Sequence, residues 1–212
     1  MRTILLLTAI AFAFTANSQT SQIILDELSA KAKTYETIDA EFSSHLVDKQ
    51  SGIDSKQEGR VQVKGDKYAL KIDSFEIFND GDSYWVYDKS SNDCTIDYVE
   101  DLGDDAFNPS ELFTIWENDF KHEMMGEMTL NSRAAYHIKL FPIDPTDKAF
   151  HTVMLYVDKA KMEVVKIEIK GREGDETTYD LNKFITNGAI QDSHFKFDES
   201  KYPGVRMSDN RI

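Results

Sequence analysis

The stretch Ile77–Tyr87, IFNDGDSYWVY, decides the fold, because it predicts two strands joined by a tight turn. The turn falls at Asp80-Gly81, and glycine tolerates the positive φ that hairpin turns require. Side chains alternate along a strand, so Trp85 and Tyr87 share one face while Tyr84 and Val86 occupy the opposite one. Large side chains on both faces of the strand indicate that either both faces are covered by other parts of the protein or one of them lines a cavity.

The flanking sequence repeats this two-residue period. Short alternating stretches between short turns are typical of an antiparallel meander, and about eleven strands are predicted in all. Residues 48–57 predict a polar loop, and residues 189–197 a short mixed stretch with one helical turn. The strands outside the central hairpin are expected at residues 38–46, 58–64, 67–72, 94–99, 120–128, 135–142, 150–157, 163–171 and 177–187.

Two amphipathic helices are also predicted. The first, residues 21–34, has an apolar stripe at helical spacing that must lie on another surface. The second begins at Asn108-Pro109, where asparagine is a good N-cap and proline fits the first helical position, and it runs to residue 118. Its large apolar residues exceed one stripe, so it is either buried nearly all round or covers an apolar surface from which it can lift. They are Leu112, Phe113, Ile115 and Trp116.

The number of strands and helices sets the expected fold class. An open sheet of this many twisted strands tends to curl towards a barrel. Two helices are too few to cover such a sheet from outside, but they can plug its mouth. We therefore expect a mainly β fold with some α: an incomplete antiparallel β-barrel of about eleven strands, covered by a lid of short helices.

Residues 1–18 predict a secretory signal peptide, because Arg2 precedes an apolar run and small residues follow at Ala16-Asn17-Ser18. No composition break suits a linker, so residues 19–212 are expected to form a single domain. Removal of Arg2 takes the formal charge from −14 to −15. This charge disfavours nucleic acid and anionic membrane surfaces as partners. The single cysteine, Cys94, excludes an internal disulfide and suits the periplasm.

Catalytic and metal-binding motifs are not apparent in the sequence. The five histidines lack zincin spacing, the acidic stretch Glu100–Asn108 lacks EF-hand spacing, and no nucleophile elbow, P-loop or dinucleotide fingerprint occurs. We expect Cys94 to be a small buried apolar residue and not a nucleophile. We therefore expect no catalytic residue, no metal and no cofactor, although a secreted hydrolase with scattered catalytic residues stays an alternative.

The feature of the sequence that indicates a function is a surplus of apolar residues, including 13 Phe, 9 Tyr and 2 Trp. Many lie on strands whose other face is also apolar, and Met124 has neighbouring methionines that suit a surface for variable apolar shapes. An ordinary β core with a covered outer face fits the same pattern equally well. The candidate cavity residues are Phe42, Leu46, Val61, Val63, Tyr68, Leu70, Ile72, Trp85, Tyr87, Leu112, Phe113, Ile115, Met124, Val153 and Leu155.

A series of short motifs in a fixed order resembles a known family. They are Ala40-Glu41-Phe42, Glu58-Gly59, Asp80-Gly81-x-x-x-Trp85-x-Tyr87, Asn108-Pro109, Thr178-Tyr179-x-Leu181, Asn187, Phe195-x-Phe197, Pro203-x-Val205 and Asp209-x-Arg211. Together they resemble the LolA-type outer-membrane lipoprotein carriers of the periplasm, over nearly the whole mature chain. Each motif is weakly specific alone, and their order is more specific.

The resemblance implies a half-open barrel with a helical lid, in a monomeric carrier without a cofactor. Such a carrier takes a lipoprotein from an inner-membrane ABC transporter, shields its acyl chains in the cavity and hands it to an outer-membrane acceptor. Better-known members carry an Arg-Pro pair that latches the lid, whereas this chain has Lys64-Gly65-Asp66, so Lys64 or Arg60 is the candidate substitute. A ligand-sensing regulatory module of the same fold is the main alternative.

Overall fold

The computed structural model describes residues 20–102, 109, 114–117, 119–146 and 148–211. The predicted signal peptide lies outside the described residues, as do Leu112 and Phe113 with most of the second predicted helix. The described residues 114–117 form a turn and a bend. The first predicted helix is confirmed at residues 20–32, and no helix among the described residues has the length and apolarity to cross a membrane.

Strands make up most of the described chain, with three short 3-10 turns: η1 (Val99–Leu102), η3 (Asp192–Phe195) and η4 (Glu199–Lys201). The turn expected before Phe195 is therefore confirmed as η3. The strands are β1 (Ile38–Asp48), β2 (Ile53–Lys64), β3 (Lys67–Ile72), β4 (Phe75–Asn79), β5 (Ser83–Asp88), β6 (Asp93–Tyr98), β7 (Phe120–Leu130), β8 (Arg133–Pro142), β9 (Phe150–Asp158), β10 (Glu163–Gly171), β11 (Glu176–Thr186) and β12 (Arg206–Asp209).

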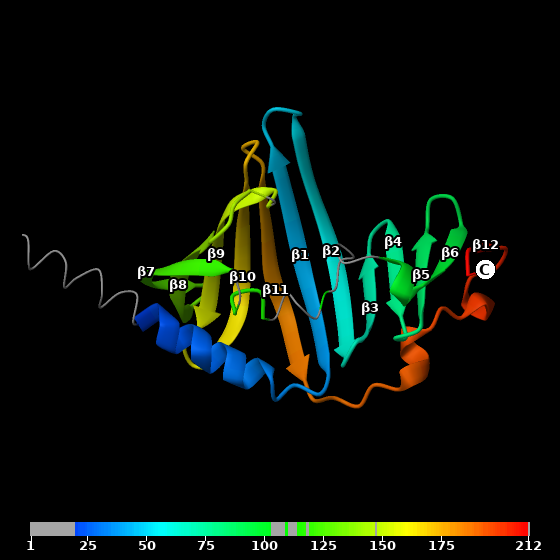
Figure 1. The fold of residues 1–212 in the computed structure, drawn as a ribbon, viewed down its shortest axis with the longest axis horizontal. Coiled ribbons are helices and arrows are strands. Elements are labelled where there is room, and N and C mark those ends of the chain that lie inside the picture. Colours follow the sequence, from blue (N-terminus) through cyan, green and yellow to red (C-terminus); the bar gives the residue numbers. More distant parts are fainter. Residues whose placement is uncertain (1–19, 103–108, 110–113, 118, 147, 212) are drawn as a thin grey trace, which may run out of the picture. The chain divides into compact units, whose positions relative to one another are not determined.

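The strands belong to one open 12-stranded sheet in the order β12-β6-β5-β4-β3-β2-β1-β11-β10-β9-β8-β7 (Figure 1). The mainly β, incomplete-barrel fold class is thus confirmed. The central hairpin is confirmed as well, since Phe78 pairs with Trp85 across the β4–β5 ladder.

Two details of the sequence prediction were wrong. The loop predicted at residues 48–57 extends only over residues 49–52, because β2 already begins at Ile53 on a stretch that is mostly polar and exposed. The sheet also has an unpredicted strand, β12, which pairs with β6 in parallel. Its four residues are all exposed, so they carry no apolar alternation that would reveal a strand.

The chain divides into two compact units that share strands β1, β2 and β11. Unit 1 contains residues 1–34, 45–55 and 115–180, and unit 2 contains residues 35–44, 56–114 and 181–212.

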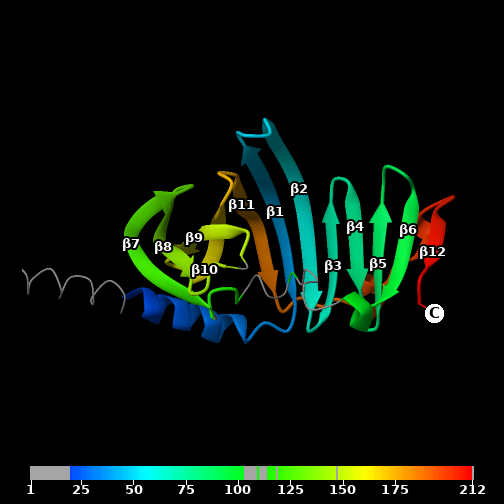
Figure 2. The same cartoon turned by 45° about the horizontal axis from the view of Figure 1, so that its top comes forward.

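The core of unit 1 lies between the N-terminal helix and strands β8–β10, and Figures 1 and 2 show this helix crossing them. The stripe residues Ile24, Leu25 and Leu28 are at most 5% exposed. They pack with Val153 and Leu155, which alternate along β9 and are fully buried. The apolar spacing of the helix therefore finds the partner surface that its sequence requires.

Unit 2 has two apolar clusters on opposite faces of β3–β5. Tyr68 and Leu70 of β3 belong to one cluster, whereas Ala69 between them belongs to the other. The alternation continues on β4, where Ile77 joins the first cluster and Phe78 the second. The double-sided character expected from the sequence is therefore present in these strands.

Candidate functional site

The first candidate surface is an apolar face of unit 2, here called the β1–β5 face. Five residues form its buried centre: Ile38, Ala40, Val61, Val63 and Tyr68. Half-buried residues pack around them: Tyr35, Phe42, Leu70, Ile77, Tyr84 and Phe184. None of these members is charged, so the face can accept hydrocarbon without burying a charge.

The opposite face of the same strands is filled by the C-terminal segment. Phe195 is fully buried against Ala69 and Phe78, and Phe197 packs on the same cluster. Trp85 also packs there. The aromatic hairpin face is thus occupied by the C-terminal segment, whereas neither Phe195 nor Phe197 belongs to the cluster of the β1–β5 face.

This arrangement separates the predicted cavity residues of unit 2. Trp85 lies on the face that the C-terminal segment covers, and the Tyr87 ring is 5.6 Å from that of Phe197 and 4.5 Å from that of Tyr202 (centroid to centroid). Five others gather on the β1–β5 face: Phe42, Val61, Val63, Tyr68 and Leu70. Leu46 of β1 and Ile72 of β3 are half-buried and belong to neither cluster.

Tyr68, one of the predicted cavity residues, is only 3% exposed and lies in the centre of the β1–β5 face. Burial raises the pKa of its phenol, and Tyr84 and Asn79 are its hydrogen-bonding neighbours. Burial also raises the pKa of Tyr84. Both hydroxyls therefore stay neutral near pH 7, and this face keeps two uncharged polar groups in an apolar setting.

The ring of Phe42 lies directly over Gly59 of the neighbouring strand β2. A Cβ atom built on Gly59 would be 2.3 Å from Cζ of Phe42, which is closer than real Cβ contacts allow. Glycine is therefore needed here for a close approach and not for a positive φ. The pair sets the position of one aromatic ring on the β1–β5 face.

In unit 1 the remaining described candidates meet in the helix-covered core. Val153 and Leu155 are buried there, and Ile115 and Met124 pack against them at its rim. The sequence thus selected members of three clusters, one in unit 1 and two on opposite faces of unit 2. The Lys64 and Arg60 side chains bind elsewhere in unit 2: Lys64 contacts Asp192 at 2.6 Å, and Arg60 makes two contacts to Asp39 at 2.7 and 2.8 Å.

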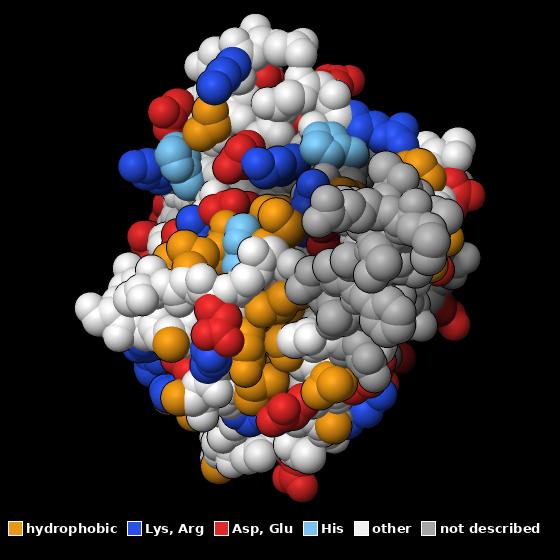
Figure 3. Space-filling model, turned by 90° about the vertical axis from the view of Figure 1, so that its left-hand side faces the viewer, with side chains coloured by type: hydrophobic (Ala, Val, Ile, Leu, Met, Phe, Trp, Pro, Cys, Tyr) orange, Lys and Arg blue, Asp and Glu red, His pale blue; other side chains and the backbone are white. Residues whose placement is uncertain are grey.

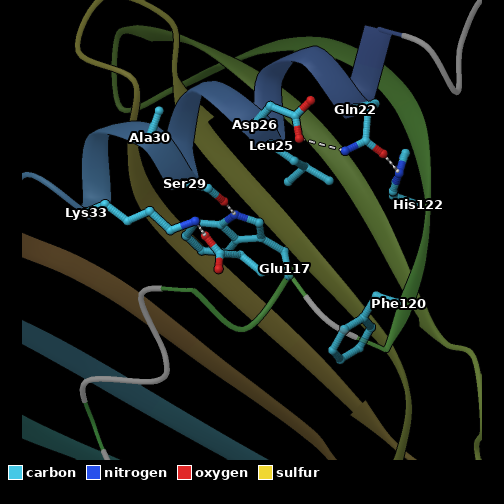
Figure 4. A pocket seen from close by; sticks show the side chains of 10 residues that line it. Gln22, Leu25, Asp26, Ser29, Ala30, Lys33, Glu117, Phe120 and His122 are labelled. Carbon is cyan, nitrogen blue, oxygen red and sulfur yellow. Dashed lines mark hydrogen bonds and ion pairs between the residues drawn. The ribbon is translucent and has the colours of Figure 1, made fainter.

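A pocket of about 490 Å³ opens beside the helix of unit 1 (Figure 4). Its volume is within the range of small-ligand pockets. Its apolar lining includes Leu25, Trp116 and Phe120, and these residues connect it to the core of the unit. Polar residues complete the lining: Gln22, Asp26, Ser29, Lys33, Glu117 and His122.

The polar residues join the helix to β7 through a chain of hydrogen bonds. His122 Nε2 donates to Gln22 Oε1 at 2.7 Å, since Gln22 donates its own amide to Asp26 at 2.7 Å. Nδ1 of His122 lies 2.9 Å from the Ser21 hydroxyl. The N-terminal end of the helix is therefore attached by polar contacts, while its stripe is attached by apolar ones.

A second set of polar contacts joins the helix to the turn at residues 114–117. The Trp116 indole donates to the Ser29 hydroxyl at 2.9 Å, and both residues are buried. Lys33 and Glu117 form an ion pair at 3.1 Å on the pocket rim. Hydrogen bonds from Lys33 and Ser29 lower the pKa of Glu117, so its carboxylate is charged at neutral pH. Sequence reasoning missed Ser29, Lys33 and Glu117, because each is an ordinary polar residue on an amphipathic helix or turn.

Hydrophobic side chains also reach the surface of the molecule on the side of β7, between charged ones (Figure 3). The large exposed apolar residues of unit 1 are Ile23, Ile53, Met125, Met128 and Ile143. Among the residues that the structure describes, no group of three or more His, Cys, Asp or Glu side chains is placed to hold a metal ion. Cys94 is fully buried, and burial raises the pKa of its thiol to about 11.

Comparison with known proteins identifies the family of this chain. The sequence model of the outer membrane lipoprotein carrier protein LolA family matches residues 33–198. The chain belongs to this family. A solved structure of an uncharacterized conserved protein from Thermus thermophilus has a TM-score of 0.59 at 12% identity, covering 90% of this chain and 99% of that one. At that identity it shows the fold alone.

A LolA superfamily protein from Nitrosomonas europaea has a TM-score of 0.42 at 13% identity, covering 84% of this chain and 97% of that one. An uncharacterized protein of Methanocaldococcus jannaschii is 27% identical over 137 residues, which are 63% of this chain and 38% of that protein. The LolA-family chain thus spans less than half the length of this relative.

Proposed function

We propose that this LolA-family chain is a periplasmic carrier and not an enzyme. It binds the acyl chains of lipoproteins on apolar surfaces and carries them from the inner to the outer membrane. It receives the lipoprotein from an inner-membrane ABC transporter and delivers it to an outer-membrane acceptor. It acts as a monomer, without a cofactor.

The observation that carries this proposal is the double-sided apolar character of β3–β5. One face is filled by Phe195 and Phe197, and the other carries a separate apolar cluster without a charged member. Each methylene removed from water contributes roughly 0.8 kcal/mol, so an acyl chain needs such a surface to cross an aqueous compartment. The description of the matched family, an outer membrane lipoprotein carrier, agrees with this chemistry.

We assign acyl-chain binding to predicted residues of both clusters. In unit 2 these are Phe42, Val61, Val63, Tyr68 and Leu70, and in unit 1 they are Ile115 and Met124 at the rim of the core, whereas Val153 and Leu155 are left out because they are fully buried beneath the helix. Trp85 and Tyr87 are left out of the proposal, because their face is occupied by the C-terminal segment. Release needs no bond to be broken, since a competing apolar site in the acceptor suffices.

Binding of a fluorescent diacylated lipopeptide to the purified mature protein tests the proposal. Leu70→Gln places an amide on the β1–β5 face, and we expect it to weaken binding by about tenfold, because an unpaired amide in an apolar site costs about 1–3 kcal/mol. Ile185→Gln is the matched control: Ile185 follows Phe184 on β11, so it points away from that face, and it is 45% exposed. It should bind like the wild type.

Two results would overturn the proposal. One is a folded wild-type protein that binds no acylated peptide, and the other is an equal loss in both variants. A transfer assay then tests the partners: lipoprotein should appear in the soluble fraction of spheroplasts with the wild type and less so with Leu70→Gln.

A further inference from the structure

The edge of β6 carries a short strand with unusual attachment. β12 lies parallel to β6, with Arg206 opposite Asp93 and Asp209 opposite Ile96 (Figure 1). Most other neighbours in the sheet are antiparallel hairpin partners, whereas β12 arrives from the C-terminal segment. β12 therefore resembles a strand added to a finished sheet edge.

Polar contacts hold this added strand. The Arg206 guanidinium contacts both carboxylate oxygens of Asp93 at 2.5 and 2.7 Å, and the Asn210 amide donates to Asp97 at 2.9 Å. The backbone amide of Arg206 donates to the carbonyl of Asn92 at 3.0 Å. All four residues of β12 are exposed, and 74% of the Arg206 side chain is accessible. The strand therefore buries little apolar surface, and exposed ion pairs stabilise only weakly.

The chain just before β12 is held much more firmly. The Tyr202 ring lies 4.4 Å from that of Phe197 and 4.5 Å from that of Tyr87, and its hydroxyl donates to Glu76 at 2.7 Å. A turn follows, in which Gly204 has a φ of +74°. A well-packed anchor thus precedes a weakly held strand, and local opening is expected to stop at the anchor.

We propose that the β6 edge is a docking site for an extended, arginine-containing segment of a partner protein, and that residues 206–211 occupy this edge until the partner displaces them. The backbone of β6 supplies hydrogen bonds to any strand, while Asp93 and Asp97 select a cation and an amide at the positions of Arg206 and Asn210. The formal charge of −14 favours a basic partner. This inference does not depend on lipid binding.

The test uses the full mature chain and a fluorescein-labelled peptide with the sequence of residues 205–211, VRMSDNR. Arg206→Glu places a negative charge opposite Asp93, and the repulsion between the two carboxylates should release residues 206–211 from the β6 edge. Fluorescence polarisation should then show the peptide binding this variant up to about fivefold more tightly than the wild type, since the competing strand has lost an exposed ion pair. Adding Asp93→Asn to Arg206→Glu should return the affinity to the wild-type level.

Lys201→Glu is the matched control, because it reverses a charge nearby in an exposed pair with Asp198 but outside β12. It should leave peptide binding unchanged. Equal affinity of the wild type and Arg206→Glu, or equal binding of a peptide with glutamate in the Arg206 position, would overturn the inference. A stable Arg206→Glu dimer without peptide would also overturn it, because the edge would then select a second copy of the chain.

Discussion

Gly59→Ala is the sharpest test of how the β1–β5 face is packed. The new methyl group would lie 2.3, 2.7 and 2.8 Å from three carbon atoms of the Phe42 ring, so the ring has to move. Phe42 is half-buried against Ile38 and its neighbours, and that packing restricts its movement. The substitution therefore forces a choice between strain in the strand and displacement of an aromatic ring.

The expected magnitude is the difference between two opposing effects. Overpacking in a protein interior costs about 1–3 kcal/mol. Replacing glycine by alanine returns about 0.4–1 kcal/mol, because the unfolded chain has fewer conformations. Overpacking is the larger effect, so the net loss in the free energy of unfolding should be at most about 2.6 kcal/mol, which lowers the melting temperature of a chain of this size by at most about 10 °C.

Urea unfolding followed by circular dichroism measures this loss, with Gly188→Ala as control. The nearest atom to a Cβ at Gly188 is 4.0 Å away, an ordinary contact, so this substitution should be neutral or slightly stabilising. A Phe42→Leu background removes the ring, and Gly59→Ala should then cost nothing. A full loss that persists in the Phe42→Leu background would refute the assignment of the clash to Phe42.

Two further predictions concern the other contacts. Ser29→Ala leaves the buried Trp116 indole without its hydrogen-bond acceptor and should lower the free energy of unfolding in urea by about 1–3 kcal/mol. Lys33→Ala breaks only an ion pair on the pocket rim and should lower it by at most about 1 kcal/mol. Equal losses in the two variants would contradict the role of the Ser29 hydrogen bond. Hydrogen bonds from Lys64 and Lys67 lower the pKa of Asp192 from 3.8 to about 2, so its contribution to stability is complete above pH 3.8 and is lost as the pH falls through about 2. The stability difference between the wild type and Asp192→Asn should therefore be constant above that range and vanish below it, and a difference that does not change with pH would contradict this ion pair.

The sequence by itself determined most of the strands, the N-terminal helix and the class of the fold. Alternation along residues 67–72 and 163–171 fixed β3 and β10 to the residue, because one-residue slips would turn every apolar side chain to the wrong face. The helical spacing of Ile24, Leu25 and Leu28 likewise predicted a helix with one buried stripe, and the structure buries those three residues. The order of the short motifs predicted the family.

Only the tertiary structure decided which apolar cluster each strand face joins and which segment covers it. Tyr68 and Trp85 are both large aromatic residues in the sequence, yet they lie on opposite faces of unit 2, and the C-terminal segment covers only the face of Trp85. Alternation states that two faces differ, but the identity of the covering segment depends on contacts such as Ala69 with Phe195, distant in sequence. β12 could not be predicted from the sequence for the same reason. It is defined by backbone hydrogen bonds to β6 and by the Arg206–Asp93 ion pair, and neither produces a recognisable pattern of residues along the chain.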